Sequence, residues 1–164
     1  MPNPTSLILP ASSLRPMPVV PGLLSPYDAV NGFVYFPRLL SKIRLHAAGR
    51  LHADFVNNLG KAFDDRCCQY LGVTYPDLRD WVLAHPAATD AEAFEWAQAR
   101  GRRLGVNDVE IWNGFMTKRG WRDEANEVLL RRLKENALGP DAGVDTMFDY
   151  IEVDEGRQAR RQAL

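Results

Sequence analysis

Apolar residues recur with helical spacing along most of this chain. Between residues 36 and 47, the positions i, i+3, i+4, i+7 and i+11 are Phe36, Leu39, Leu40, Ile43 and Ala47. This period places all five on one face of an α-helix. Stretches of the same kind end at a glycine, at Gly49, Gly72, Gly101 and Gly120. Glycine is the residue that most often follows a helix C-terminus, so the pattern predicts helix after helix.

Signals that start helices precede the same stretches. Ser25-Pro26 predicts a short first helix that Asn31-Gly32 ends, and Phe36-Pro37 starts the next one. Proline suits the first turn of a helix because its missing N–H would have no partner there. The later starts are predicted at Thr74, at Thr89 or Asp90, at Asn107 as the cap of a capping-box pattern, at Asp123, and near Asp145.

Only Gly32–Tyr35 has any strand character, and no repeat of fixed period is visible. We therefore predict an all-α fold, a single compact domain of six to eight helices. The six prolines within residues 1–22 predict a proline-rich, extended N-terminal arm. We place the helical domain at residues 23–157 and a charged tail at 158–164.

Size and charge exclude several classes of protein. The chain has 164 residues and a net charge of −1, which is typical of one soluble domain and lacks the basic excess of a nucleic-acid-binding protein. No apolar run approaches the ~18 residues of a membrane span. The only two cysteines are adjacent, so they cannot staple a fold. We expect a protein of the reducing cytoplasm that binds neither nucleic acid nor membrane.

Four ordered segments carry a resemblance to a known family. They are Tyr35-Phe36-Pro37-Arg38 with Lys42-Ile43-Arg44-Leu45, Asn58-Leu59-Gly60 with residues 63–68, residues 110–116 with Arg119-Gly120-Trp121, and residues 148–157. Together they span about residues 24–157 and resemble a bacterial family catalogued as domain of unknown function 5069. The resemblance implies a small, mostly helical cytoplasmic protein. It implies no activity and no catalytic residues.

A row of basic residues is the first candidate site. Arg38, Lys42 and His46 stand at i, i+4 and i+8 of the helix predicted from residue 36, and Arg44 projects elsewhere on the same helix. Neighbouring cationic groups repel each other unless an anion lies against them. The row is therefore either a binding site for a carboxylate or phosphate, or a face that pairs with the protein's own carboxylates.

Residues 63–72 hold the second candidate, in which acids, a guanidinium and two thiols share one helix. Asp64 and Asp65 could act as general acid or base, or simply cap the helix. Cys68 is a candidate nucleophile partnered by His46, with Arg66 lowering and the two acids raising the pKa of its thiol. Cys67 lies on the apolar stripe and is interpreted as a small buried hydrophobe.

The third candidate combines aromatic and acidic residues late in the chain. Trp121 and Arg122 follow Gly120 in a turn, and Asp149 and Tyr150 belong to the last predicted helix. Trp121 either lines a pocket or plugs a helix junction. Our preferred hypothesis is that the acidic C-terminal segment closes over a pocket and pairs with the basic row.

No metal site and no cofactor are predicted. Adjacent cysteines on a helix diverge by ~100°, and zinc sites prefer cysteines spaced by two to four residues. The sequence has no Gly-rich phosphate loop, nucleophile elbow or His-Glu-x-x-His helix.

Two functions remain open. One is a cofactor-independent enzyme or binding protein for a small anionic metabolite, which would use an Arg-, Lys- and His-lined pocket. The other is a helical module that docks an acidic partner protein. Whether the protein is an enzyme, and its oligomeric state, stay undecided at the sequence level.

Overall fold

The computed structural model describes residues 18–160, and within this range the fold is almost entirely helical. The elements are β1 (Ala29–Val30), β2 (Phe33–Val34), α1 (Phe36–Ala47), α2 (Ala53–Val56), α3 (Phe63–Leu71), α4 (Tyr75–Ala84), α5 (Asp90–Arg100), α6 (Val106–Lys118), α7 (Asn126–Glu135), a short 3₁₀ turn (Pro140–Ala142) and α8 (Met147–Asp154). The predicted all-α class is confirmed, with eight α-helices in the described residues. Residues 1–17 of the predicted arm and 161–164 of the predicted tail lie outside the described range.

Local capping explains where the helices in the middle of the chain begin and end. The Thr74 hydroxyl accepts a hydrogen bond from the Asp77 N–H and starts α4. At α5, Thr89 and Glu92 form a complete capping box. Gly72 adopts the left-handed conformation that ends α3. These boundaries match the predictions because each depends on residues only a few positions apart.

Residues 25–32 do not form the predicted helix. A turn, in which the Asp28 carboxylate accepts from the Ser25 N–H at 2.9 Å, leads into an antiparallel hairpin that pairs Ala29 with Val34. Asn31 and Gly32 form its turn with φ of 48° and 79°. Two successive positive φ values suit a two-residue hairpin turn, for which Asn-Gly is the strongest signal. This part of the prediction was wrong.

The start of α6 is shifted from its predicted place. Gly105 rather than Asn107 is the N-cap, and the Asp108 carboxylate accepts a hydrogen bond from the Gly105 N–H at 2.8 Å. The predicted cap at Asn107 was wrong: Gly105 has no side chain that could cap α6, and only the carboxylate half of the capping pattern is present, from Asp108. Asp123 accepts from the N–H groups of Gly120 and Ala125 and so shapes the turn before α7, which begins at Asn126.

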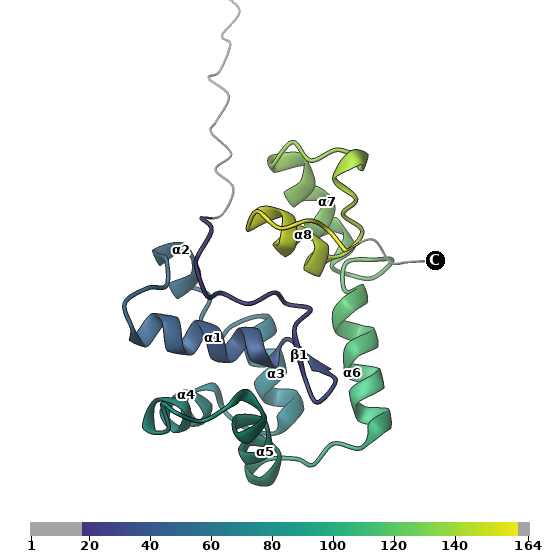
Figure 1. Cartoon of the computed structure of the whole chain (residues 1–164). Helices are drawn as coiled ribbons and strands as arrows, with labels where there is room; N and C mark the ends of the chain where they lie inside the picture. The colour runs from purple at the N-terminus through teal and green to yellow at the C-terminus, as the bar shows by residue number, and fades with distance from the viewer. Residues whose placement is uncertain (1–17, 161–164) are drawn as a thin grey trace, which may run out of the picture.

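The main core surrounds α1, which Figure 1 shows at the centre of the molecule with α4 and α5 along one side. Phe36, Leu39 and Leu40 of α1 are completely buried. Trp112 of α6 stacks on Phe33 of the hairpin at a ring-centroid distance of 5.0 Å, and its indole N–H donates to the Val34 carbonyl at 3.0 Å. The hairpin is thereby fixed between α1 and α6.

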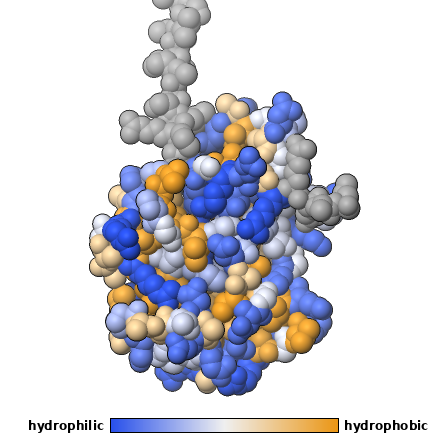
Figure 2. Space-filling model, viewed as in Figure 1, coloured by the Kyte–Doolittle hydropathy of each residue, from blue (hydrophilic) through white to orange (hydrophobic). Residues whose placement is uncertain are grey.

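A second, smaller cluster lies where α7 and α8 pack together, at the other end of α6 (Figure 1). Leu129, Met147 and Tyr150 form its buried centre. Hydrophilic residues predominate on the face shown in Figure 2, and apolar residues appear there in scattered patches. Within residues 18–160 no helix is both long enough and apolar enough to cross a membrane.

Candidate functional site

Two buried ion pairs connect α1 to other parts of the fold. One reaches the residue that follows α8, and the other reaches α3. In the first pair, both terminal nitrogens of the Arg38 guanidinium donate hydrogen bonds to the Glu155 carboxylate, one of them at 2.9 Å. Arg38 lies in α1, and Glu155 follows α8. Arg38 also donates to the Leu24 carbonyl at 2.8 Å. Both charged side chains are nearly completely buried. The acidic C-terminal segment therefore does meet the basic row of α1.

The second pair lies one helical turn further along α1. The Lys42 amine lies 2.5 Å from an Asp64 carboxylate oxygen, and Asp64 is fully buried. The Tyr35 hydroxyl donates to the same carboxylate at 2.7 Å and accepts from the Lys42 amine at 3.3 Å. The Gly60 N–H donates to the other carboxylate oxygen at 3.1 Å. The Asp64 carboxylate is thus held by three donors, two from α1 and its N-cap and one from the loop before α3.

Burial and neighbouring charges change the acidity of this network. Burial lowers the pKa of the Lys42 ammonium below its ordinary value, although the Asp64 carboxylate opposes that shift. Burial and the Asp64 charge raise the pKa of the Tyr35 phenol well above its usual range. Burial opposes the charge on Arg38, but the hydrogen bonds and charge of Glu155 outweigh it and raise the pKa of the guanidinium.

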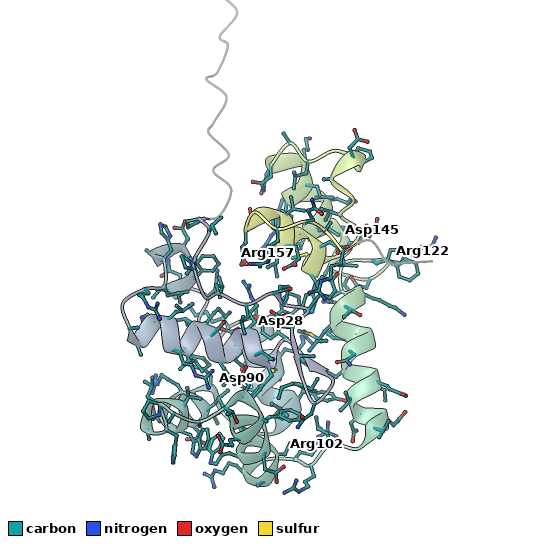
Figure 3. All side chains as sticks on the ribbon, viewed as in Figure 1. Asp28, Asp90, Arg102, Arg122, Asp145 and Arg157 are labelled. Atoms are coloured by element: carbon teal, nitrogen blue, oxygen red, sulfur yellow. The ribbon has the colours of Figure 1, made fainter. Side chains whose placement is uncertain are left out.

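Arg157 ties the end of α8 to the same network. Its guanidinium donates to the Glu152 carboxylate at 2.7 Å and to the Glu155 carboxylate. Figure 3 shows Arg157 beside α8. Glu155 is therefore shared between Arg38 and Arg157, and α8 is held against α1 by charge as well as by apolar packing.

A cavity of about 350 Å³ lies against these ion pairs. Its walls come from α1, α2, α3 and the loop before α3 on one side, and from α7, α8 and the end of α6 on the other. Two acidic residues, Asp154 and Glu155, belong to the lining. The basic residues of the lining are Arg38, Lys42, Lys61, Arg66, Arg119 and Arg132. Tyr35, Phe55, Phe63 and Tyr150 supply aromatic surface.

The basic residues of the cavity differ in whether a carboxylate neutralises their charge. Arg119 pairs with Glu124 at 2.9 Å and with Asp123 at 3.3 Å. Arg66 instead lies over the Phe115 ring, and Arg132 over the Tyr150 ring. Among the salt bridges of residues 18–160, none involves Arg66 or Arg132. The mouth of the cavity thus presents guanidinium groups held by aromatic faces.

Two of the five non-glycine residues with positive φ among residues 18–160 belong to the same cavity. Tyr35, the residue before α1, has φ of 77°, and Ala62, the residue before α3, has φ of 51°. Both line the cavity. Positive φ costs a residue with a Cβ roughly 1–2 kcal/mol, and such outliers cluster at functional sites.

The structure separates the basic row that the sequence predicted. Arg38, Lys42, Arg66 and Tyr150 all line the cavity, and Asp64 lies behind Lys42. His46, at i+8 of the row, is exposed and does not line it. Arg44 instead pairs with Asp90 at 2.6 Å.

The remaining candidates of α3 lie outside the cavity. Asp65 is exposed and accepts a hydrogen bond from Gln69 at 2.6 Å. Cys68 is buried, and burial together with Asp64 and Asp65 raises the pKa of its thiol to about 12. This shift favours the protonated thiol over the thiolate, which is the nucleophilic form of cysteine. Cys67 is a fully buried core residue, as predicted.

The aromatic and acidic candidates near the C-terminus lie at two different cavities: Tyr150 lines the first, and Trp121 and Asp149 lie at another. Trp121 is 50% exposed, and the Arg122 guanidinium lies over its ring. Trp121 and Asp149 line a second cavity of about 230 Å³. Asp149 is buried, accepts from the Tyr27 hydroxyl at 2.7 Å and helps to begin α8. Its contacts there are those of a structural cap.

Three basic residues of the cavity were not among the site residues predicted from the sequence. Lys61 precedes α3, Arg119 ends α6 and Arg132 lies within α7. Arg132 stands three residues after the buried Leu129, which places it on the flank of the apolar stripe of α7. That spacing is the one local signal that could have identified it.

Comparison with known proteins supports the resemblance seen in the sequence. The family model with the description Domain of unknown function (DUF5069) matches residues 21–157. No curated protein and no solved structure matches the chain. The match covers most of the chain and all of the residues that line the cavity of about 350 Å³, so the chain belongs to the family DUF5069.

Proposed function

We propose that this protein binds a small anionic molecule in the cavity between α1–α3 and α7–α8. The observation that carries the proposal is the lining, which holds six basic and two acidic side chains. The chain as a whole has a net charge of −1, so the basic excess at the cavity is local. A concave wall of one sign concentrates an oppositely charged ligand.

The arrangement of the charges indicates where the anion would lie. Glu155 and Asp64 already neutralise Arg38 and Lys42 at the inner wall. Arg66 and Arg132 are exposed and lie over the rings of Phe115 and Tyr150, and neither takes part in a salt bridge among residues 18–160. An arginine fork can bind a carboxylate or a phosphate through two parallel hydrogen bonds.

The dimensions also favour a small molecule over a protein partner. A volume of about 350 Å³ falls within the range of ligand pockets. Aromatic side chains on the wall suit a ligand with some apolar surface. A helical docking module would instead use a flat basic face beside an apolar patch, and the basic residues here line a concave surface.

The test is a thermal-unfolding series against a panel of small carboxylates and phosphates. A ligand at 100 times its Kd stabilises the folded state by about 2.7 kcal/mol, which raises the unfolding midpoint of a chain this long by roughly 5–10 °C. Arg132→Gln should abolish most of that shift. Arg131→Gln is the matched control, because Arg131 is the neighbouring residue, is exposed, lies outside the cavity lining and pairs with Glu135 within α7.

If the ligand raised the unfolding midpoint equally in Arg132→Gln and Arg131→Gln, the anion would bind elsewhere and the proposal would be overturned. The absence of any shift across the panel would do the same and would favour the docking module, with a search for protein partners as the next step.

We place the protein in the reducing cytoplasm, a proposal supported by the two free, buried thiols.

A further inference from the structure

Lys42 differs from every other lysine of the chain in its surroundings. The chain has four lysines, Lys42, Lys61, Lys118 and Lys134. Only Lys42 is buried, and it is nonetheless part of the cavity wall. Its amine contacts a carboxylate, that of Asp64 at 2.5 Å, and a phenol, that of Tyr35 at 3.3 Å.

Those two neighbours are the groups that an amine needs in order to react with a carbonyl compound. The amine must first lose a proton, and Asp64 is placed to take it. The carbonyl oxygen must then gain a proton, and the phenol of Tyr35 also lines the cavity. Buried lysines with a hydrophobic wall serve as imine-forming nucleophiles because burial favours their neutral form.

We propose that Lys42 forms an imine with a carbonyl compound that carries a carboxylate or phosphate, such as a 2-oxo acid. The inference rests on the proposed function, because Arg66 and Arg132 would hold the anionic group of that compound at the mouth of the cavity. Lys42 would then meet its carbonyl carbon at the inner wall.

The reaction balances without any further reagent. Asp64 takes a proton from the Lys42 ammonium, and the neutral nitrogen attacks the carbonyl carbon while the carbonyl oxygen takes the Tyr35 proton. The nitrogen then returns a proton to the Tyr35 phenolate, which leaves a neutral carbinolamine. Tyr35 protonates the hydroxyl group, the C–O bond breaks, water leaves and the nitrogen lone pair forms the C=N bond. The proton on Asp64 finally passes to Tyr35 along their 2.7 Å hydrogen bond.

The acid–base properties of the site agree with these roles. Burial lowers the pKa of the Lys42 ammonium, which increases the neutral fraction that can attack. Burial and Asp64 raise the pKa of the Tyr35 phenol, so Tyr35 carries the proton that it must donate. The positive φ of Tyr35 fixes the residue at the start of α1, where its hydroxyl reaches both Lys42 and Asp64.

The experiment is reductive trapping on the full chain. The protein is incubated at neutral pH with glyoxylate or pyruvate and with sodium cyanoborohydride, which reduces an imine to a stable secondary amine. Peptide mass spectrometry then follows the modification of each lysine with time. Lys118 and Lys134 are exposed, lie outside the lining of this cavity and serve as internal controls in the same sample, whereas Lys61 is exposed but belongs to the lining.

We expect Lys42 to be modified before the three exposed lysines. Tyr35→Phe keeps the ring but removes the proton donor, and should slow the modification of Lys42 by about 100-fold or more without affecting the other lysines. Lys42→Arg keeps the positive charge beside Asp64 and should lose the adduct at this position. The wild-type ranking of the four lysines decides the question even if a variant fails to fold.

A parallel measurement separates this inference from the proposed function. Glycolate and lactate carry the same carboxylate without the carbonyl group, so they report anion binding alone through the unfolding midpoint. If they raise the midpoint while Lys42 is modified no faster than the exposed lysines, the imine is overturned and the anion site stands. If they give no shift and Lys42 is not preferred, both proposals fail.

Discussion

The Lys42 amine lies 2.5 Å from the Asp64 carboxylate, and the two side chains are only 7% and 0% exposed. Asp64→Asn would leave the ammonium buried without its counter-charge. Removing one partner of a buried pair costs about 3–5 kcal/mol, and we expect a loss of that size in the free energy of unfolding measured with urea.

Glu95→Gln provides the comparison for that measurement. Glu95 pairs with Arg103 on the surface, where both side chains are more than half exposed. Solvent screens such a pair, so its loss should cost no more than about 1 kcal/mol. Similar losses in the two variants would show that the buried pair contributes no more to stability than an exposed one.

The thiol of Cys68 should make the fold sensitive to alkaline pH. In the unfolded chain its ordinary pKa is 9.0, whereas burial raises the folded value to about 12. Between these values the folded state binds more protons than the unfolded state, so stability falls as pH rises. The slope for one such group approaches about 1.4 kcal/mol per pH unit. Below pH 9 this contribution is fully present.

Cys68→Ala removes that titration and should flatten the pH dependence of unfolding between pH 9 and 12. The difference in slope between wild type and variant isolates the thiol from Tyr35 and Lys42, which remain in both proteins. Parallel curves above pH 9 would mean that the thiol titrates in the folded state as it does in the unfolded chain.

Replacement by alanine should lower the stability of the fold at one glycine and raise it at another. A Cβ on Gly101 would lie 2.1 Å from the Leu71 carbonyl oxygen, whereas a Cβ on Gly114, inside α6, would meet nothing within 4 Å. Gly101→Ala should therefore destabilise by several kcal/mol, as backbone atoms must move. Gly114→Ala should stabilise by about 0.5–1 kcal/mol because alanine favours the helix. Thermal unfolding of the two variants tests both signs.

The backbone strain at Ala62 can be measured by replacing this residue with glycine. Ala62 has φ of 51°, which glycine tolerates without the Cβ penalty. Ala91, exposed and inside α5, is the control, where Ala→Gly should cost about 1 kcal/mol. We expect Ala62→Gly to cost at least about 1 kcal/mol less than Ala91→Gly. Equal costs in denaturant unfolding would mean that Ala62 is not strained.

Sequence reasoning worked best where structure depends on near neighbours. Thr74, Thr89 and Gly72 mark helix ends through contacts within four residues, and they were located correctly. The hairpin was missed because each strand has only two residues, too few to show alternation. Asn31-Gly32 was interpreted as a helix end, although the same pair is the strongest signal for a hairpin turn.

The site was harder to predict because its groups are distant in sequence. Periodicity located Arg38 and Lys42 on one side of α1 and indicated that anions must oppose them. The identity of those anions depends on packing, since Glu155 is 117 residues from Arg38. Periodicity also extended the row to His46, but in the last turn of α1 only Leu45 is buried, and His46 and Ala47 are exposed.

The walls of the cavity of about 350 Å³ come from residues 35–66 and 119–155, with nothing from the 52 residues between. A ligand held there would contact helices from the early and the late parts of the chain at once. Because such a ligand would bind the folded state and not the unfolded chain, its occupancy would raise the free energy of unfolding. The concentration of the ligand would then set how long each folded molecule lasts before a protease reaches it.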